Sequence, residues 1–479
     1  MLSWINQSID LLNRAHFGII NHGPLYGPIE NFAIRRDENL ILRLETTAAP
    51  GATSTAIQNT PGLVSFNTAQ VELENISKIK AVLSGVRSHL VNTSHSQLNP
   101  QENTLKEFAE IDQLSVFTGD AAKAIYTIEW LENISGHGHI WPDAIRSKTE
   151  TTSTWTIGPA DDSITLTNED NRTGTSYAAI KLLVEGNTFY VCSSNCDDRT
   201  LGIKPGCIIY EGTPDILVRK KIRTALSFAL GVYLIEVGHT LYDKDWHSVL
   251  VVARSPYSLG KRAFDLHAMP LAHLSDRNWQ FDLGRVKLTR MVNALYLSYE
   301  SLDLGNLSWA YWHARIATVH IAPAHLGAAI EALLDAYTKK YPGTISTKAL
   351  AKCEWKSLSN AIRDVISNFS ISDINKAIIS GNVSNINRVP IRNILAAICS
   401  AIDIDLGEPE TAAWSRRNDA AHGTPIAEGE ELAAIKDMKL LMGLFHRLLL
   451  RITDASDSYI DYASPHHPIS ILKAPPSAS

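Results

Sequence analysis

Short runs of alternating hydrophobic and polar residues dominate the chain from its start to about residue 210. Clusters of Gly, Pro, Asn, Asp and Thr separate these runs at intervals that are typical of sheet proteins. The run from Phe32 to Leu44 is broken by Arg36-Asp37-Glu38-Asn39, so we predict a hairpin that turns at Asn39. Further strands are predicted at Thr152–Ile157, Ser163–Leu166, Ala178–Val184 and, after a turn at Gly186-Asn187, Thr188–Cys192. This region is therefore expected to be mainly β.

The hydrophobic pattern changes near residue 213 to helical spacing. Pro214 opens a segment in which Ile222 and Leu226 share one face, and Gly231 is expected to interrupt the helix. A strand-like run follows from Trp246 to Ala253, and the residues after it are irregular to about residue 285. We therefore expect this part to complete the β-rich region or to connect it to the next domain.

From about residue 286 onward helical periodicity dominates. The strongest segment, His325 to Tyr337, carries a hydrophobic face of Leu326, Ile330, Leu333 and Leu334. Other helices are predicted at Val286–Tyr299, Thr347–Phe369, Ile371–Ser380, Pro390–Ser400, Glu408–His422 and Gly429–Ile452. Helices of this length joined by short loops indicate an antiparallel bundle.

Together the patterns predict an α+β protein of several domains, as the length of 479 residues also suggests. We expect a β-rich N-terminal domain at residues 1–212 and a mixed α/β connector, or the end of that domain, at 213–305. An all-α helical bundle should occupy residues 306–460. Prolines in residues 461–479 predict a flexible tail.

Composition and charge narrow the classes of function. A hydrophobic content of 45% and a charged content of 20% are those of a folded globular protein. A net charge of −6 argues against a general nucleic-acid coat protein, so any RNA contact must depend on a local basic site. No apolar run is long enough for a membrane span, and residues 1–20 show no secretory signal. We therefore expect a cytoplasmic protein with no membrane partner.

Three cysteines, Cys192, Cys196 and Cys207, lie close enough to suggest a zinc site completed by a nearby His. Structural zinc usually shows tight pairs of cysteines, and only one of these spacings is short, so ordinary strand and loop cysteines are the favoured interpretation. Phosphate-loop, dinucleotide-binding, HExxH and GxSxG motifs are absent from the sequence. We accordingly predict neither a metal nor a cofactor, with the zinc alternative left open.

The candidate chemistry lies in Arg417-Asn418-Asp419-Ala420-Ala421-His422-Gly423. Arg417 is a permanent cation whose planar fork of donors matches phosphate oxygens, and His422 can both accept and donate a proton near neutral pH. Gly423 is a natural C-cap, which would place His422 at the end of a helix. The combination suits cleavage of a phosphodiester.

The order of these residues resembles the RNxxxH signature of the HEPN-domain ribonucleases. The chain looks most similar to the ApeA-like branch, which joins a β-rich N-terminal region to a C-terminal HEPN domain in bacterial anti-phage defence. The residues that carry the resemblance lie in the last third of the chain. The resemblance implies a homodimer in which two motifs face one cleft, an RNA substrate with tRNA as one candidate, and a sensor region that responds to a phage-derived trigger.

Each motif residue has an expected role. On an ideal helix Asn418 and His422 share a face, whereas Arg417 is rotated by roughly 140° from His422. Arg417 and His422 of one copy can therefore hardly contact the same phosphate. We expect a ribose 2′-hydroxyl to attack phosphorus, with His422 transferring protons and Arg417 stabilising the phosphorane. The negative end of the helix dipole favours the protonated imidazole. Asn418 should orient His422 or contact the substrate, and a plain surface amide is the alternative.

Two further residues complete the candidate site. Glu331, on an earlier helix, is expected to position the basic pair, as acidic residues do in some HEPN families, with a solvated Glu as the alternative. Arg416 is a second candidate phosphate contact, and Arg417 is preferred because only it is followed by Asn. Two other functions stay open: a non-catalytic HEPN-like dimerisation or adaptor module, and a ligand-binding protein that acts through its β-rich half.

Overall fold

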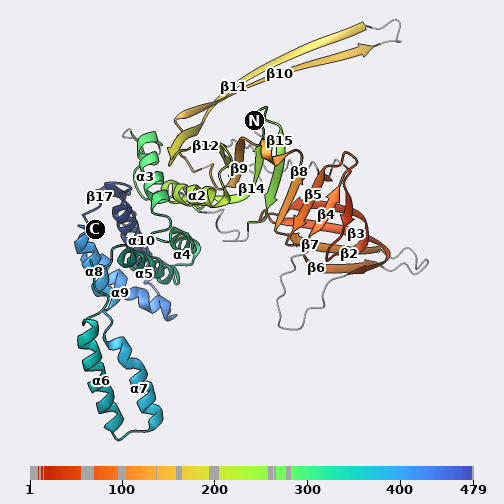
Figure 1. Ribbon diagram of the computed structural model, residues 1–479. Helices are drawn as coiled ribbons and strands as arrows, with labels where there is room; N and C mark the ends of the chain where they lie inside the picture. Colours follow the sequence, from red (N-terminus) through yellow and green to blue (C-terminus); the bar gives the residue numbers. More distant parts are fainter. Residues whose placement is uncertain are drawn as a thin grey trace. The chain divides into compact units, whose positions relative to one another are not determined.

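The computed structural model describes residues 9, 12–13, 16–54, 70–94, 104–135, 137–157, 164–193, 204–256, 263, 266–276 and 282–476. The chain forms two compact units. The first, here called the β unit, comprises Met1–Pro270 and Leu274–Asn293, and the second, the helical unit, comprises Leu271–His273 and Ala294–Ser479. The predicted α+β class is confirmed, with sheets in the first half and helices in the second (Figure 1).

Two antiparallel sheets build the described part of the β unit. The larger has eleven strands in the order β1-β4-β5-β8-β15-β14-β9-β13-β12-β11-β10, and the smaller has the order β2-β3-β7-β6. The strands are β1 (Gly18–Asn21), β2 (Tyr26–Arg36), β3 (Leu42–Ser54), β4 (Val71–Glu74), β5 (Lys80–Ser84), β6 (Arg87–Ser94), β7 (Thr104–Ile111), β8 (Gln113–Phe117), β9 (Tyr126–Glu132), β10 (Asp143–Ile157), β11 (Ile164–Val184), β12 (Asn187–Ser193), β13 (Gly206–Glu211), β14 (Ile235–Tyr242) and β15 (Ser248–Arg254).

The predicted hairpin at residues 32–44 is confirmed as β2 and β3, whose Ile34 and Leu44 are paired. Both side chains are buried in a core shared with Leu83 and Val116 of the larger sheet, so the period-two pattern marks the inner face of a sandwich. The turn is held by Asp37, whose carboxylate accepts hydrogen bonds of 2.9 Å from two backbone amides further along the turn. The sequence pattern thus identified both strands, and the turn lies at Asn39 as predicted.

The strands predicted at Ser163–Leu166 and Ala178–Val184 are joined in the structure as one strand, β11. It pairs with β10 along the whole of Asp143–Ile157, and the two project as a ribbon from the sheet (Figure 1). Most of the residues between the two predicted strands are polar. A two-stranded ribbon has no hydrophobic core to cover, so the hydrophobic alternation used to find strands is lost there.

The segment after residue 213 completes the β unit. Helix α2 (Ile216–Leu230) begins after Asp215, which caps the amide of Val218 at 2.8 Å, and ends as predicted at Gly231. Gly231 has a φ of 70°, and a Cβ there would lie 2.0 Å from the backbone of Met269, so this end requires glycine. Strands β14 and β15 then enter the larger sheet between β9 and β8. Within residues 213–305, Leu271–His273 and the residues from Ala294 onward belong to the helical unit and the others to the β unit.

The helical unit is a bundle with a protruding hairpin. Its helices and those that lead into it are α3 (Arg285–Leu297), α4 (Leu304–Ile316), α5 (Ala322–Lys340), α6 (Lys352–Asn368), α7 (Asp373–Ile386), α8 (Ile391–Ala401), α9 (Glu408–Ala421) and α10 (Glu431–Thr453). The predicted face of α5 is confirmed, since all four of its hydrophobic residues are buried. Helix α4 was missed, because it is hydrophobic on most sides and shows little periodicity. Helix α7 ends six residues later than expected, and α6 begins later.

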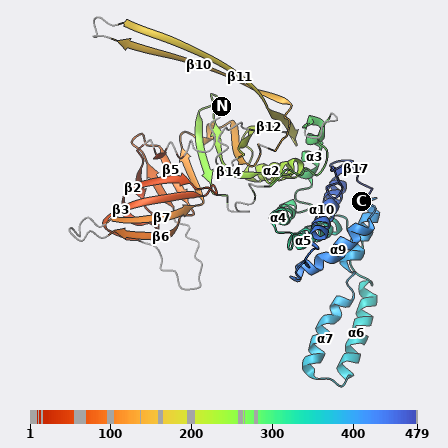
Figure 2. The ribbon, with the colours of Figure 1, turned by 180° about the vertical axis from the view of Figure 1, so that it is seen from behind.

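Helices α6 and α7 pack against each other and extend from the rest of the bundle in both views (Figure 2). Among the helices that the structure describes, none is both long enough and apolar enough to cross a bilayer.

The expectation of a flexible tail is wrong for residues 461–476. Strand β16 (Ser458–Ile460) pairs with β17 (Ile469–Ile471), and Leu472 is buried. The guanidinium of Arg447, on α10 and fully buried, donates 2.8–3.0 Å hydrogen bonds to the carbonyls of Leu472 and Lys473. The prolines did not predict an ordered tail, because the tail is held through its backbone carbonyls by the buried guanidinium of Arg447 on α10.

His446 on α10 should make the stability of the helical unit depend on pH. It is fully buried, its Nε2 lies 2.8 Å from the hydroxyl of Tyr311, and burial followed by the charge of Arg315 lowers its pKa from 6.5 to about 3. The folded state thus favours neutral histidine, and the stability that this gives is present above pH 6.5 and lost as the pH falls toward 3. We expect a loss of about 1.4 kcal/mol per pH unit in that window.

Urea unfolding of the full chain at pH 7, 6 and 5 measures this slope. His446→Gln keeps a partner for Tyr311 and removes the titration, so its unfolding free energy should depend less on pH than that of the parent. Parallel pH slopes for parent and variant would show that His446 does not account for the acid sensitivity.

Candidate functional site

Helix α9 ends where the sequence predicted. It begins after Gly407, whose amide donates a 3.0 Å hydrogen bond to the carboxylate of Glu410, and its last helical residue is Ala421. His422 is the C-cap, and Gly423 follows with a φ of 73°, in the left-handed region that favours glycine. The amide of Thr424 donates to the carbonyl of Asp419 at 2.9 Å and closes the helix end. This termination fixes His422 at the carboxyl end of the helix.

Arg417 lies inside the fold, with 6% of its surface exposed. Its guanidinium forms an ion pair with Glu331 on α5 and donates a 2.8 Å hydrogen bond to the carbonyl of Trp414. It also lies over the indole of Trp414, 3.5 Å from the ring centroid. The structure therefore brings together Arg417 and the acidic residue expected to position it, and the side chain of Glu331 stays half exposed.

Asn418 and His422 are both exposed, in keeping with their predicted common side of the helix. Among the residues that the structure describes, none forms a hydrogen bond or ion pair with the imidazole of His422. Arg417, in contrast, is buried against α5. The two motif residues therefore do not converge within one copy of the chain, which is what a rotation of roughly 140° on the helix predicted.

Arg416 is the second candidate cation and is occupied differently. Its side chain is exposed, and two of its nitrogens bind the carboxylate of Asp437 on α10 at 2.5 and 2.6 Å. This bidentate pair links α9 to α10 at the surface. Arg416 could contact a phosphate only in competition with that carboxylate.

A pocket of about 270 Å³ lies between α9, α10 and the start of α5. Arg416, Arg417 and Asp437 contribute polar groups to its wall, and Pro323 is part of its apolar lining. The imidazole in this wall belongs to His320, in the turn before α5, and not to His422. Sequence reasoning missed His320, because no local pattern connects it with a motif almost a hundred residues later.

Trp414 and Gly327 are the other residues that sequence reasoning missed. Trp414 precedes Arg417 by three positions, and helical spacing alone could have placed the two on one face. Gly327 on α5 offered no such signal. A Cβ built on Gly327 would lie 2.6 Å from Cδ and 2.8 Å from Nε of Arg417, so the absence of a side chain there makes room for the arginine.

Gly327→Ala should therefore disturb the position of Arg417. A helical glycine replaced by alanine ordinarily gains about 0.5–1 kcal/mol, whereas the collision with a side chain pinned by Glu331 and Trp414 costs about 1–3 kcal/mol. We expect a net loss of roughly 1 kcal/mol in unfolding free energy. Urea denaturation measures it, and Gly443→Ala on α10, where a Cβ meets nothing within 4 Å, is the matched control that should gain stability. Equal effects at both positions would contradict the tight contact.

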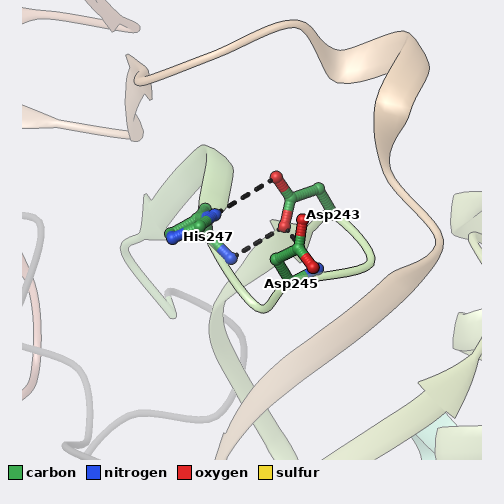
Figure 3. A group of neighbouring side chains, drawn as sticks. All are labelled: Asp243, Asp245 and His247. Atoms are coloured by element: carbon green, nitrogen blue, oxygen red, sulfur yellow. Dashed lines mark hydrogen bonds and ion pairs between the residues drawn. The ribbon is translucent and has the colours of Figure 1, made fainter.

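A second cluster of polar side chains lies in the turn between β14 and β15 (Figure 3). Asp243, Asp245 and His247 come within metal-ligand distance of one another. The carboxylate of Asp243 accepts 2.9 Å hydrogen bonds from the amides of Asp245 and His247 and lies 3.5 Å from the imidazole. The hydrogen bond from the His247 amide is the main reason that the pKa of Asp243 is lowered. These bonds account for the cluster as a turn structure.

The cysteines considered for zinc are only partly described. Cys192 and Cys207 are opposite each other on β12 and β13 and are buried in the core of the β unit. Cys196 lies outside the described residues. The two that can be placed therefore occupy the positions of ordinary strand cysteines.

Comparison of the chain with protein-family models, with curated proteins and with solved structures found no match. The resemblance to HEPN ribonucleases therefore depends on the motif residues and on the helices that carry them.

Proposed function

We propose that the chain is a metal-independent endoribonuclease of the HEPN type, whose site is completed by two copies. One observation carries the proposal. At the end of α9 a buttressed guanidinium, Arg417, lines a pocket, and His422 presents an imidazole to solvent without a partner among the described residues. Phosphodiester cleavage requires a fixed cation and an accessible proton-transfer group, which two copies would bring together.

Two copies would bring together Arg417 and His422, which do not converge within one copy. In the proposed reaction the 2′-hydroxyl of a ribose attacks the adjacent phosphorus and the bond to the 5′-oxygen of the next nucleotide breaks. His422 of one copy takes the proton of the attacking hydroxyl and then gives it to the leaving oxygen, and the second copy supplies Arg417. Arg417 stabilises the charge on the phosphorane. The products are a 2′,3′-cyclic phosphate and a 5′-hydroxyl, and DNA lacks the nucleophile.

The pocket beside Arg417 supports a role in binding the substrate. Its apolar lining and its two guanidinium groups suit a nucleobase next to a phosphate, and His320 offers a further polar contact. Asn418 is exposed on the side of His422, where it can contact RNA or orient the imidazole. The wall of this pocket also carries the carboxylates of Asp419, Glu430 and Asp437, so an RNA phosphate would compete with carboxylates for the two guanidinium groups.

The resemblance extends the proposal to its biological setting. In that setting the β unit senses a phage-derived trigger in the cytoplasm, and the nuclease then cuts RNA, with tRNA as one candidate. The order of a β unit before a helical unit supports this assignment by architecture alone.

The second candidate function is a non-catalytic dimerisation or adaptor module. The contacts of Arg417 favour this function, because its guanidinium is already paired with Glu331 and stacked on Trp414. A structural arginine would be held in this way. RNA cleavage that depends on both Arg417 and His422 separates the two functions.

A further inference from the structure

A pocket of about 340 Å³ lies on the smaller sheet of the β unit, on the face turned away from the core of the sandwich. Successive side chains of a strand alternate between the two faces, so Arg35 and Arg43 point away from the core into which Ile34 and Leu44 point. The pocket is lined from all four strands, and β2 and β6 form the two edges of this sheet. Three strand spacings separate these edges, about 14 Å in all. The pocket therefore spans the width of the sheet.

Two arginines stand opposite each other in this pocket. Arg35 on β2 is paired with Arg43 on β3, and like charges directly opposite each other destabilise a sheet. The charge of Arg43 is compensated, because its guanidinium lies 2.9 Å from the carboxylate of Asp37 and also forms an ion pair with Glu110. The guanidinium of Arg35 is exposed and has no hydrogen bond or ion pair among the residues that the structure describes. Surface arginines are commonly solvated, so the rest of the wall decides whether Arg35 can serve a ligand.

The other charged groups of the wall already have partners. Besides its ion pair, Asp37 accepts hydrogen bonds from two backbone amides of its own turn. The carboxylate of Glu45 lies 3.6 Å from the amine of Lys106. The guanidinium of Arg36 donates 2.7 Å hydrogen bonds to three backbone carbonyls. The carboxylates of the wall are thus occupied, and the positive charge of Arg35 stays available to an anion.

A β-bulge brings His89 into the same wall. The pairing of β6 with β7 shifts its register between Ser88 and Leu90, so His89 is the extra residue of the bulge. Bulges re-aim side chains and are frequent beside binding sites. The imidazole of His89 is exposed and, within the described part of the chain, has no hydrogen-bond partner. Phe108 on β7, opposite Leu90, adds a partly exposed aromatic ring to the pocket.

These groups define the chemistry of a ligand. The planar fork of a guanidinium matches the oxygens of a phosphate, and an aromatic ring stacks on a nucleobase. An imidazole can form a hydrogen bond with the polar edge of a base. Ligand pockets usually measure about 300–1,000 Å³, so this one is near the lower end and suits a single nucleotide and not a nucleic-acid chain.

We propose that this pocket binds a nucleoside monophosphate. The phosphate lies at the β2 edge, between Arg35 and Arg43, where it relieves the contact of two like charges. The base stacks on Phe108, and His89 contacts its polar edge from β6. All of these residues belong to the β unit, so the proposal does not depend on cleavage of RNA by the helical unit.

Isothermal titration calorimetry of the full chain tests the proposal with AMP, GMP, CMP and UMP as separate probes. The parent should bind at least one of them with a dissociation constant of about 100 μM or lower. The matching nucleoside and inorganic phosphate should each bind at least tenfold more weakly, because each lacks one half of the contacts. Inorganic phosphate that binds as tightly as the nucleotide, or a parent that binds none of the four, overturns the proposal.

The variants locate the bound nucleotide. Arg35→Ala should weaken binding at least tenfold and leave thermal unfolding unchanged, because the side chain is exposed and has no partner among the described residues. Phe108→Leu keeps an apolar side chain without the aromatic face and should weaken binding about fivefold. Arg146→Ala removes an exposed arginine on β10, outside the pocket, and is the control that should bind like the parent. A nucleotide bound elsewhere, such as beside Arg417, would still bind to the Arg35→Ala variant, so an unchanged affinity of that variant overturns this site.

Discussion

Replacing His422 with alanine is expected to lower the rate of RNA cleavage by a factor of about 10²–10⁴, the usual contribution of a positioned proton-transfer group. The folded state should be unaffected, because the imidazole is exposed and has no partner among the described residues. Arg417→Ala should lower the rate at least as much, since it removes the charge that stabilises the phosphorane. Arg417→Lys keeps the charge but loses the planar fork, so it should recover only part of the activity.

The assay follows end-labelled RNA and identifies the product termini as a cyclic phosphate and a 5′-hydroxyl. Extract from phage-infected bacteria is added in parallel, to supply the proposed trigger. His466→Ala and Arg363→Ala remove an exposed histidine and an exposed arginine elsewhere in the helical unit and should leave the rate unchanged. Parent protein that leaves total RNA intact with and without the extract would refute the ribonuclease proposal.

Mixing the two inactive variants tests whether the site is shared. If each site takes Arg417 from one copy and His422 from the other, a mixed dimer of Arg417→Ala and His422→Ala chains contains one intact site. Cleavage should then reappear on mixing. If both residues act within one copy, the mixture should stay inactive. That result would contradict the two-copy site but not the proposed cleavage reaction.

Glu331→Gln separates positioning from catalysis at the same site. The amide keeps the size of the carboxylate and removes the charge that holds Arg417. A positioning role predicts a lower rate with little change in the Michaelis constant. A solvated glutamate predicts no change in either quantity.

Replacing Arg447 with methionine is expected to lower the unfolding free energy of the helical unit by about 3–5 kcal/mol, the usual cost of breaking a buried ion pair. Arg447 donates to both carboxylate oxygens of Glu410, at 2.7 and 2.9 Å, and to the carbonyls of Asp405, Leu472 and Lys473. Glu410 is only 1% exposed, and burial raises its pKa while Arg447 opposes that shift. Methionine would leave a buried carboxylate and three carbonyls without this donor.

Urea denaturation measures the loss, and limited proteolysis should show faster cleavage between residues 461 and 476. Adding Glu410→Gln to Arg447→Met should recover part of the stability, because the unpaired charge is then removed. Arg451→Ala, one turn later on α10, breaks a 3.5 Å pair with the exposed Asp403 and should cost at most about 1 kcal/mol. Similar losses for Arg447→Met and Arg451→Ala would show that burial of the pair has little influence.

The sequence by itself determined the features that depend on local chain chemistry. Helix α9 ends beside His422 because Gly423 alone tolerates the left-handed backbone there, and α2 ends at Gly231 for the same reason. The hydrophobic period of α5 identified its buried face. Helical phase also predicted that Arg417 and His422 point apart.

Only the tertiary structure decided which distant groups meet. Glu331 reaches Arg417 across α5 and α9, His320 shares its pocket wall, and Arg447 fixes a tail that its prolines predicted to be free. Contacts of this kind depend on how helices far apart in sequence are aligned, and no spacing along one segment encodes that alignment. The hydrophobic pattern also failed at α4 and in the β10–β11 ribbon, since one is apolar on most sides and the other has no core to cover.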